Sequence, residues 1–341
     1  MSGRPAPDLP GSAQEAATWV REVRSGRRRS EELIPLLAEE SPIYAGMGSG
    51  EADRLRGHIL ASFAWSDVPE AALPYILEEL ETGRNPFTVA AAAHAVRAAA
   101  PPPAEAAALV ESAIRRIRGR NQPVDFERLL PSPAHAGGRT ALGELEQAQA
   151  ELQARPCCAH IGKASAPALP ADAPRLGEIE VQDQDGEILA LGNLVGGRAA
   201  LLTGFYTRCT NPQKCSLTIS KLGRLWNLVE AAGLAGQVAV AGVSYDPEFD
   251  LPARLHDYGA ARNLRFSANL RLLRTTGPFE PLRQRLAFGV GYGDATVNRH
   301  RLDLILLNPD GTLAEYRTRR LWDERDVFDR LAAAAPPPLG G

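Results

Sequence analysis

Two cysteines flank a short loop between an apolar segment and an amphipathic one, and this loop constrains the fold more than any other part of the chain. Cys209 and Cys215 enclose the residues T-N-P-Q-K. The preceding run A-A-L-L-T-G-F-Y (199–206) predicts a buried strand, and apolar residues recur at helical spacing over Leu217–Ala232. Thiols held between a strand and a helix have two main uses, the exchange of disulfides and the binding of a soft metal.

The composition narrows the class of protein that carries this loop. Four cysteines in 341 residues are too few for a disulfide scaffold, and a net charge of −3 argues against nucleic-acid binding through a basic surface. Neither a signal-peptide pattern nor an apolar run of about 18 residues is present, so we expect a cytoplasmic protein without membrane insertion. A strand that presents two thiols at the start of a helix is typical of a thioredoxin-like domain.

The first part of the chain, residues 1–155, shows helical periodicity and few strand signals. Ser12 is a candidate N-cap with Glu15 completing a capping box, and Ser30 repeats the capping signal. Short helix pairs that recur at about 40 residues resemble degenerate HEAT-like repeats and predict an interaction domain, with an irregular helical bundle as the alternative. The expected helices are 12–24, 30–40, 51–65, 71–81, 86–99, 104–118 and 140–153.

A segment rich in proline and alanine, residues 156–174, predicts a linker, and the pattern then changes over residues 175–335. Two hairpins are expected around D-Q-D-G and N-P-D-G, since Asp-Gly favours tight turns. Strands that alternate with helices in this order predict an α/β sandwich. The expected strands are 177–182, 187–191, 198–206, 237–244, 302–307 and 311–316, and the expected helices are 217–232, 251–261, 281–287 and 323–334.

Three motifs in residues 175–335 resemble those of the Sco/SenC family of copper-handling, thioredoxin-fold proteins. They are a D-x-x-G hairpin followed by a strand ending in G-F-Y-T-R-C, the turn V-S-Y-D-P-E-F-D, and a histidine eight residues before a Pro-Asp-Gly turn. His300 stands eight positions before Asn308 of N-P-D-G, which matches that register. The expected fold is therefore an all-α, HEAT-like domain followed by an α/β thioredoxin-like domain of Sco type.

The resemblance implies a copper site made of Cys209, Cys215 and His300, because the family binds copper with two cysteines and one histidine. Thiolates are soft ligands suited to Cu(I), and imidazole accepts either oxidation state of copper. The chain departs from the family in its cysteine spacing, which is C-x5-C here and C-x3-C in the family. We expect Arg208, Lys214 and the N-terminus of the next helix to lower the pKa of the thiols.

Further residues are candidates for supporting roles. Asp246 and Asp250 follow the strand 237–244, where an acid can orient the histidine or a loop donor; a structural role in an Asp-Pro turn is the alternative. The linker pair Cys157 and Cys158, with His160 nearby, could hold a second soft metal or resolve a disulfide, or be incidental. Gly289, Gly291 and Gly293 predict a mobile loop near His300.

Three functions are consistent with these residues. The first is copper handling, or copper-linked thiol redox chemistry, with the helical domain docking a protein client. The second is a thiol–disulfide oxidoreductase that cycles Cys209 and Cys215 without metal; the absence of a proline facing the dithiol between Pro281 and Pro309 favours the metal site over this alternative. The third is an interaction protein whose helical array is the functional part.

Overall fold

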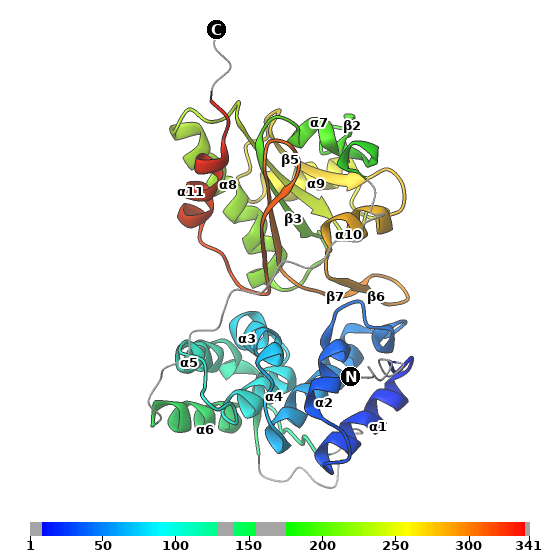
Figure 1. The fold of residues 1–341 in the computed structure, drawn as a ribbon, viewed down its shortest axis with the longest axis vertical. Helices are drawn as coiled ribbons and strands as arrows, with labels where there is room; N and C mark the ends of the chain where they lie inside the picture. Colours follow the sequence, from blue (N-terminus) through cyan, green and yellow to red (C-terminus); the bar gives the residue numbers. More distant parts are fainter. Residues whose placement is uncertain (1–8, 128–138, 155–174, 338–341) are drawn as a thin grey trace, which may run out of the picture. The chain divides into compact units, whose positions relative to one another are not determined.

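The computed structural model describes residues 9–127, 139–154 and 175–337, and its chain divides into two compact units (Figure 1). Unit 1 comprises Met1–Gly162 together with Val290–His300. Unit 2 comprises Lys163–Gly289 and Arg301–Gly341. The predicted linker, residues 156–174, lies outside the described residues, so its boundaries stay a prediction. The part of the chain that the structure describes contains no helix long and apolar enough to cross a bilayer.

Unit 1 is helical, as its periodicity predicts. Ser12 caps the first helix, where its hydroxyl accepts from the amide of Glu15, and Thr140 caps the last in the same way. The expected helix from Ser30 is a 3-10 helix, Ser30–Leu37, because Pro35 has no amide proton for an α-helical hydrogen bond. The α-helices are α1 (Ala13–Arg24), α2 (Ser49–Ser62), α3 (Leu73–Thr82), α4 (Pro86–Val96), α5 (Ala106–Ile117) and α6 (Ala141–Gln153).

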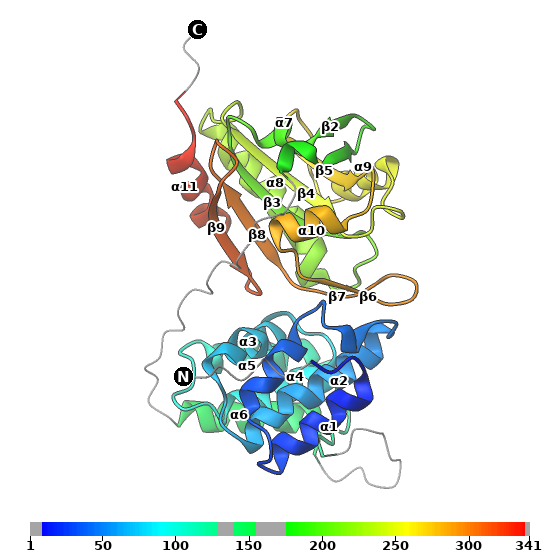
Figure 2. The same cartoon turned by 45° about the vertical axis from the view of Figure 1, so that its right-hand side comes forward.

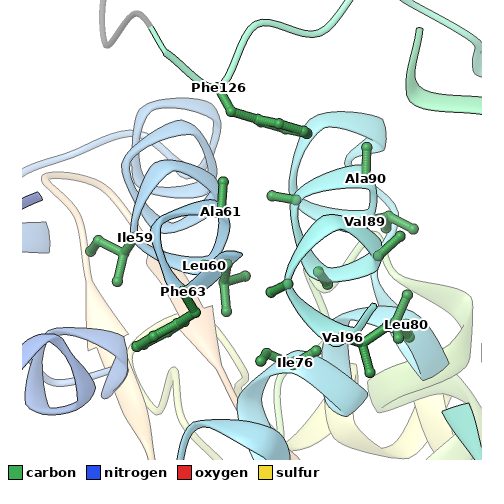
Figure 3. Packing of buried hydrophobic residues seen from close by; sticks show 14 of the residues in the cluster. Ile59, Leu60, Ala61, Phe63, Ile76, Leu80, Val89, Ala90, Val96 and Phe126 are labelled. Carbon is green, nitrogen blue, oxygen red and sulfur yellow. The ribbon is translucent and has the colours of Figure 1, made fainter. Parts of the chain in front are cut away.

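Helix α4 forms the centre of the core of unit 1. Every residue from Phe87 to Val96 is buried, which is the pattern of a helix surrounded by other helices. Figure 3 shows Leu60 of α2 and Ile76 of α3 near α4, and both belong to the same buried apolar cluster as Val89 and Val96. The helical class is thereby confirmed, whereas the HEAT-like repeat stays a prediction.

Unit 1 also contains a β-hairpin that is distant in sequence from its helices. Strands β6 (Val290–Tyr292) and β7 (Val297–His300) pair antiparallel, so the mobile loop expected at Gly289, Gly291 and Gly293 is wrong. The amide of the Asn298 side chain donates to the carbonyl oxygens of Tyr44 (2.9 Å) and Met47 (3.1 Å). A Cβ atom on Gly291 would lie 2.2 Å from the carbonyl oxygen of Glu39, so only glycine permits this close approach.

Arg299 holds the hairpin through buried ion pairs. Its guanidinium donates to Asp53 at 2.6 Å and to Glu79 at 3.1 Å, and its side chain is only 7% exposed. Burial lowers the pKa of Arg299, but the surrounding acidic groups, Glu79 and Asp53 first among them, raise the pKa by more. Glu79 also accepts from Arg56 at 2.9 Å, and Arg56 is fully buried. The acids of this cluster are therefore paired by one arginine from α2 and one from the hairpin.

Unit 2 is built on a seven-stranded mixed sheet of order β2-β1-β5-β4-β3-β8-β9. The central strand β3 pairs parallel with β4 and antiparallel with β8, and all seven of its residues are buried. The strands are β1 (Glu180–Asp183), β2 (Ile188–Ala190), β3 (Ala199–Phe205), β4 (Val238–Ser244), β5 (Leu270–Thr275), β8 (Asp303–Leu307) and β9 (Leu313–Thr318). Both predicted hairpins are present, whereas β5 was not predicted.

Helices cover both faces of this sheet (Figure 2). Ile219 and Trp226 of α8 and Leu331 of α11 pack with Leu201 on one face. On the other face, Leu286 of α10 lies with Ile305. The α/β sandwich predicted from the sequence is confirmed. The helices are α7 (Leu191–Val195), α8 (Leu217–Ala231), α9 (Pro252–Ala260), α10 (Glu280–Leu286) and α11 (Glu324–Ala334).

The buried ion pairs of Arg299 make a testable contribution to the stability of unit 1. Arg299→Met keeps the bulk of the side chain but leaves Asp53 and Glu79 without this cation, and breaking such a buried pair costs about 3 kcal/mol or more. We expect guanidinium denaturation followed by circular dichroism to show this loss. The control is Arg115→Met. Arg115 forms an exposed ion pair with Glu111, and the loss of this pair costs less than about 0.5 kcal/mol. Equal effects of the two variants would contradict the prediction.

Candidate metal centre

The register of the central strands brings the two cysteines and the histidine to one edge of the sheet. Cys209 follows the carboxyl end of β3 by four residues. Because β8 runs antiparallel to β3, with Thr203 opposite Leu304, the start of β8 lies at that same end. His300 precedes the first residue of β8 by three positions. Strand pairing alone therefore directs both segments to the same place.

A buried carboxylate, Asp250, holds the chain just before Cys209. Its oxygens accept from the backbone amide of Thr207 at 3.1 Å, from the hydroxyl of Thr207, and from the hydroxyl of Ser244 at 2.5 Å. Burial raises the pKa of Asp250, although these hydrogen bonds partly oppose the rise. The carboxylate therefore ties the end of β4 to the start of the thiol loop, which is the structural role left open for it by the sequence.

The extra length of the C-x5-C loop is taken up by one wide turn. Asn211 begins the turn, and its side-chain oxygen accepts from the amide of Gln213 at 3.0 Å. The turn Pro212–Ser216 has π-type hydrogen bonding, and Lys214 within it departs from helical dihedral angles. Cys215 is fully buried in the core beneath α8, whereas Cys209 is half-buried. Neither cysteine is in a disulfide.

The ligand atoms of Cys209, Cys215 and His300 all lie within 4.8 Å of one another. His300 is the last residue of β7 and is 7% exposed. Two sulfurs and one imidazole nitrogen at these separations can converge on a single metal ion with little movement. This donor set is soft, and it suits Cu(I) or zinc far better than magnesium or calcium. The structure thus brings together the three residues that the sequence nominated.

Burial reverses the expected direction of one thiol pKa. The pKa of Cys215 is raised well above its ordinary value by burial first, and then by its interaction with Cys209. Lys214 lowers this pKa, but by less than burial raises it. The expectation that nearby cations would lower the pKa of the thiols is therefore wrong for Cys215, because the sequence does not reveal how deeply that sulfur lies.

The remaining candidates are either engaged elsewhere or outside the described residues. The carboxylate of Asp246 accepts from Arg208 at 2.5 Å, and this arginine also lies over the ring of Phe249 at 4.2 Å. Asp246 is accordingly not part of the three-residue group. The second thiol pair, Cys157 and Cys158, lies with His160 outside the described residues.

Three tyrosines border the thiols, and the sequence nominated none of them as a site residue. The pKa of Tyr206 is raised by burial and then by Cys209 and Cys215. Burial also raises the pKa of Tyr258 and Tyr245, with Cys215 contributing in both cases. Tyr258 stacks on Phe205 at 5.7 Å between ring centroids. Tyr245 directly follows the V-S dipeptide at the end of β4, which is the signal that could have identified it.

Comparison with known proteins finds a family model that resembles the C-terminal part of the chain. Residues 171–335 match the family model described as SCO1/SenC. No curated protein sequence matches the chain.

Several solved structures resemble part of the chain. One is BsSco, described as a member of the Sco family of cytochrome c oxidase assembly proteins with a disulfide switch. It is 21% identical to this chain, the match covers 49% of this chain and 96% of BsSco, and the TM-score is 0.40. Arabidopsis thaliana ScoI with copper bound is 20% identical over 47% and 97%, with a TM-score of 0.38. Yeast Sco1 with copper bound is 21% identical over 49% and 92%, with a TM-score of 0.37.

The motifs, the mixed sheet and the family match therefore agree for one part of the molecule. Residues 171–335 of this chain are similar to the SCO1/SenC family.

Proposed function

We propose that this protein handles copper, which it binds as Cu(I) through Cys209, Cys215 and His300. The observation that carries the proposal is the convergence of three ligand atoms within 4.8 Å from segments about 90 residues apart. The match of residues 171–335 to the SCO1/SenC family model supports the same assignment. Copper is the cargo in this proposal, and the protein supplies a site that takes it up and releases it.

The two cysteines and the histidine would have different parts in this site. Cys215 lies in the core and supplies a sulfur that water cannot reach, whereas the half-buried Cys209 is open to an approaching donor or acceptor of copper. His300 adds a nitrogen ligand that binds both oxidation states of copper. Such a site can retain copper when one ligand exchanges, which suits transfer to a protein client.

A second candidate function is thiol–disulfide exchange without metal. It is favoured by one observation, the half-exposed position of Cys209 next to a buried Cys215. Cys209 would attack a disulfide of a protein client, and Cys215 would then displace the client thiol, so that two electrons and two protons pass to the client. The raised pKa of Cys215 makes its thiolate scarce at neutral pH, which slows this second displacement.

Two further expectations from the sequence stay predictions. These are a cytoplasmic location and a protein client docked by residues 1–155. The second is tested by isolating copper-loaded full-length protein with its partners and repeating the isolation with exposed residues of unit 1 replaced. A partner set that does not change with any of these replacements would contradict a docking role for the helices.

The first test of the copper site is an anaerobic titration of the reduced full-length protein with Cu(I) against a competing chelator. We expect one copper per chain, and His300→Ala should weaken binding about tenfold or more, which corresponds to about 1.4 kcal/mol. The matched control is His256→Ala, which removes an exposed imidazole that is not in the three-residue group and should leave the affinity unchanged. Loss of copper by the wild type, together with a readily formed Cys209–Cys215 disulfide, would instead support the oxidoreductase.

The pH dependence of copper binding follows from the raised pKa of Cys215. Because the folded protein favours the neutral thiol, this sulfur carries a proton near neutral pH, and the metal must displace it. The apparent affinity for Cu(I) should therefore rise with pH, by about tenfold per pH unit for each proton released. Titrations at three pH values between about 6 and 8 measure this slope. In Cys215→Ser one proton fewer is released on binding, so the slope should fall by about one log unit of affinity per pH unit. A slope of zero in the wild type would contradict the prediction.

A further inference from the structure

The segment that ends in His300 leaves and re-enters unit 2 at a single point. Gly289 is the last residue of unit 2 before the segment, and Arg301 is the first residue after it. The amide of Arg301 donates to the carbonyl oxygen of Gly289 at 3.0 Å, so the two ends are directly paired. His300 is adjacent to this pairing, and its position depends on how firmly the two ends are held.

One carboxylate holds both ends. Oδ2 of Asp303 accepts from the backbone amide of Gly289 at 2.9 Å, and Oδ1 accepts from Nε of Arg301 at 2.6 Å. Asp303 is only 1% exposed, and it begins β8, whose other four residues are leucine or isoleucine. Burying a charged group among such residues costs free energy unless it is paired, so an acid here needs an explanation beyond filling the strand.

The neighbouring strand β9 completes the surroundings of Asp303. The hydroxyls of Tyr316 and Thr318 lie 2.9 and 3.1 Å from Oδ1. Arg301 also donates to Tyr316 and to the carbonyl oxygen of Ala287. Every one of these partners belongs to unit 2, and together they enclose a carboxylate whose two oxygens both accept hydrogen bonds.

Glycine at position 289 is required for this arrangement. A Cβ atom there would lie 2.4 Å from Nε of Arg301 and 2.5 Å from its Cδ, closer than any side chain tolerates. Because Gly289 has no side chain, the side chain of Arg301 can pass close to its backbone and reach Asp303. Gly289, Arg301 and Asp303 therefore form one hydrogen-bonded group at the base of the hairpin.

We propose that Asp303 is a positioning residue for His300: by holding Gly289 and Arg301 together, it fixes where the imidazole meets the two cysteines. The inference rests on the proposed function, in which His300 binds copper. It assigns the buried acid of β8 a role in ligand geometry rather than in folding alone.

The test is a double-mutant cycle on the full-length protein, measured as Cu(I) affinity against a competing chelator. Asp303→Asn leaves a single acceptor oxygen, so either Gly289 or Arg301 loses its partner. We expect this variant to bind Cu(I) about tenfold more weakly, and Asp303→Asn combined with His300→Ala to bind no more weakly than His300→Ala alone. Additive losses in the double variant would overturn the proposal, because Asp303 would then act by another route.

The matched control is Asp183→Asn. Asp183 is also buried, accepts from the backbone amides of Asp185 and Glu187 at 2.9 Å, and pairs with Arg271 at 2.6 Å, but it holds the turn between β1 and β2. It should leave Cu(I) affinity unchanged while lowering stability to a similar degree. Equal weakening of copper binding by both variants would overturn the proposal, because the effect would be one of general stability.

A second measurement does not depend on copper. Hydrogen exchange in the metal-free protein should be faster over residues 290–301 in Asp303→Asn than in the wild type, with no comparable change in β4 or α8. Unchanged exchange over this segment would overturn the proposal. A wild type that binds no copper would instead refute the proposed function, and exchange would still decide whether Asp303 holds the hairpin.

If Asp303→Asn does not fold, Tyr316→Phe serves as the milder variant. It removes the hydroxyl beside both Asp303 and Arg301 but keeps the aromatic ring. We expect a smaller loss of Cu(I) affinity, of about threefold, that disappears in the His300→Ala background. An unchanged affinity, or a loss that persists without His300, would count against the proposal.

Discussion

The pairing of β3 with a parallel neighbour on one side and an antiparallel neighbour on the other is the constraint on which the site depends. The parallel pairing places Asp250, just beyond β4, beside the thiol loop, and the antiparallel pairing places the start of β8 there. If β8 ran parallel to β3, the residues before it would emerge at the opposite edge. A cysteine pair and a histidine about 90 residues apart can therefore meet without any loop crossing the sheet.

Buried aspartates recur wherever a segment of unit 2 must be held in one position. Asp250 holds the thiol loop, Asp303 holds the base of the segment ending in His300, and Asp183 holds a hairpin turn. Each accepts at least one backbone amide proton, so each compensates its burial with hydrogen bonds that hydrophobic residues could not make. These hydrogen bonds hold a loop, the base of a segment and a turn of unit 2, while the apolar core supplies most of the free energy of folding.

Features that leave a local pattern could be predicted from the sequence. Features that depend on how deeply a side chain is buried could not. The apolar run before Cys209 predicts β3. The spacing of His300 from N-P-D-G identifies the histidine of the site. Strand β5 was missed because arginines interrupt L-R-L-L-R-T, and both are only partly buried. The pKa of Cys215 depends on how deeply its sulfur is buried, and the partners of Asp303 depend on how neighbouring strands pair, and no short pattern reveals either.

The discontinuity of unit 1 has a consequence for how the protein is made. During synthesis the ribosome produces Asp53 and Glu79 more than 200 residues before Arg299, the cation that pairs with both. At typical rates of about 5 to 20 residues per second, the helices wait on the order of ten seconds or longer for this partner. In that interval Glu79 has Arg56 but not Arg299, and Asp53 still lacks the arginine with which it pairs, so the final form of unit 1 is set only when most of the chain has been translated.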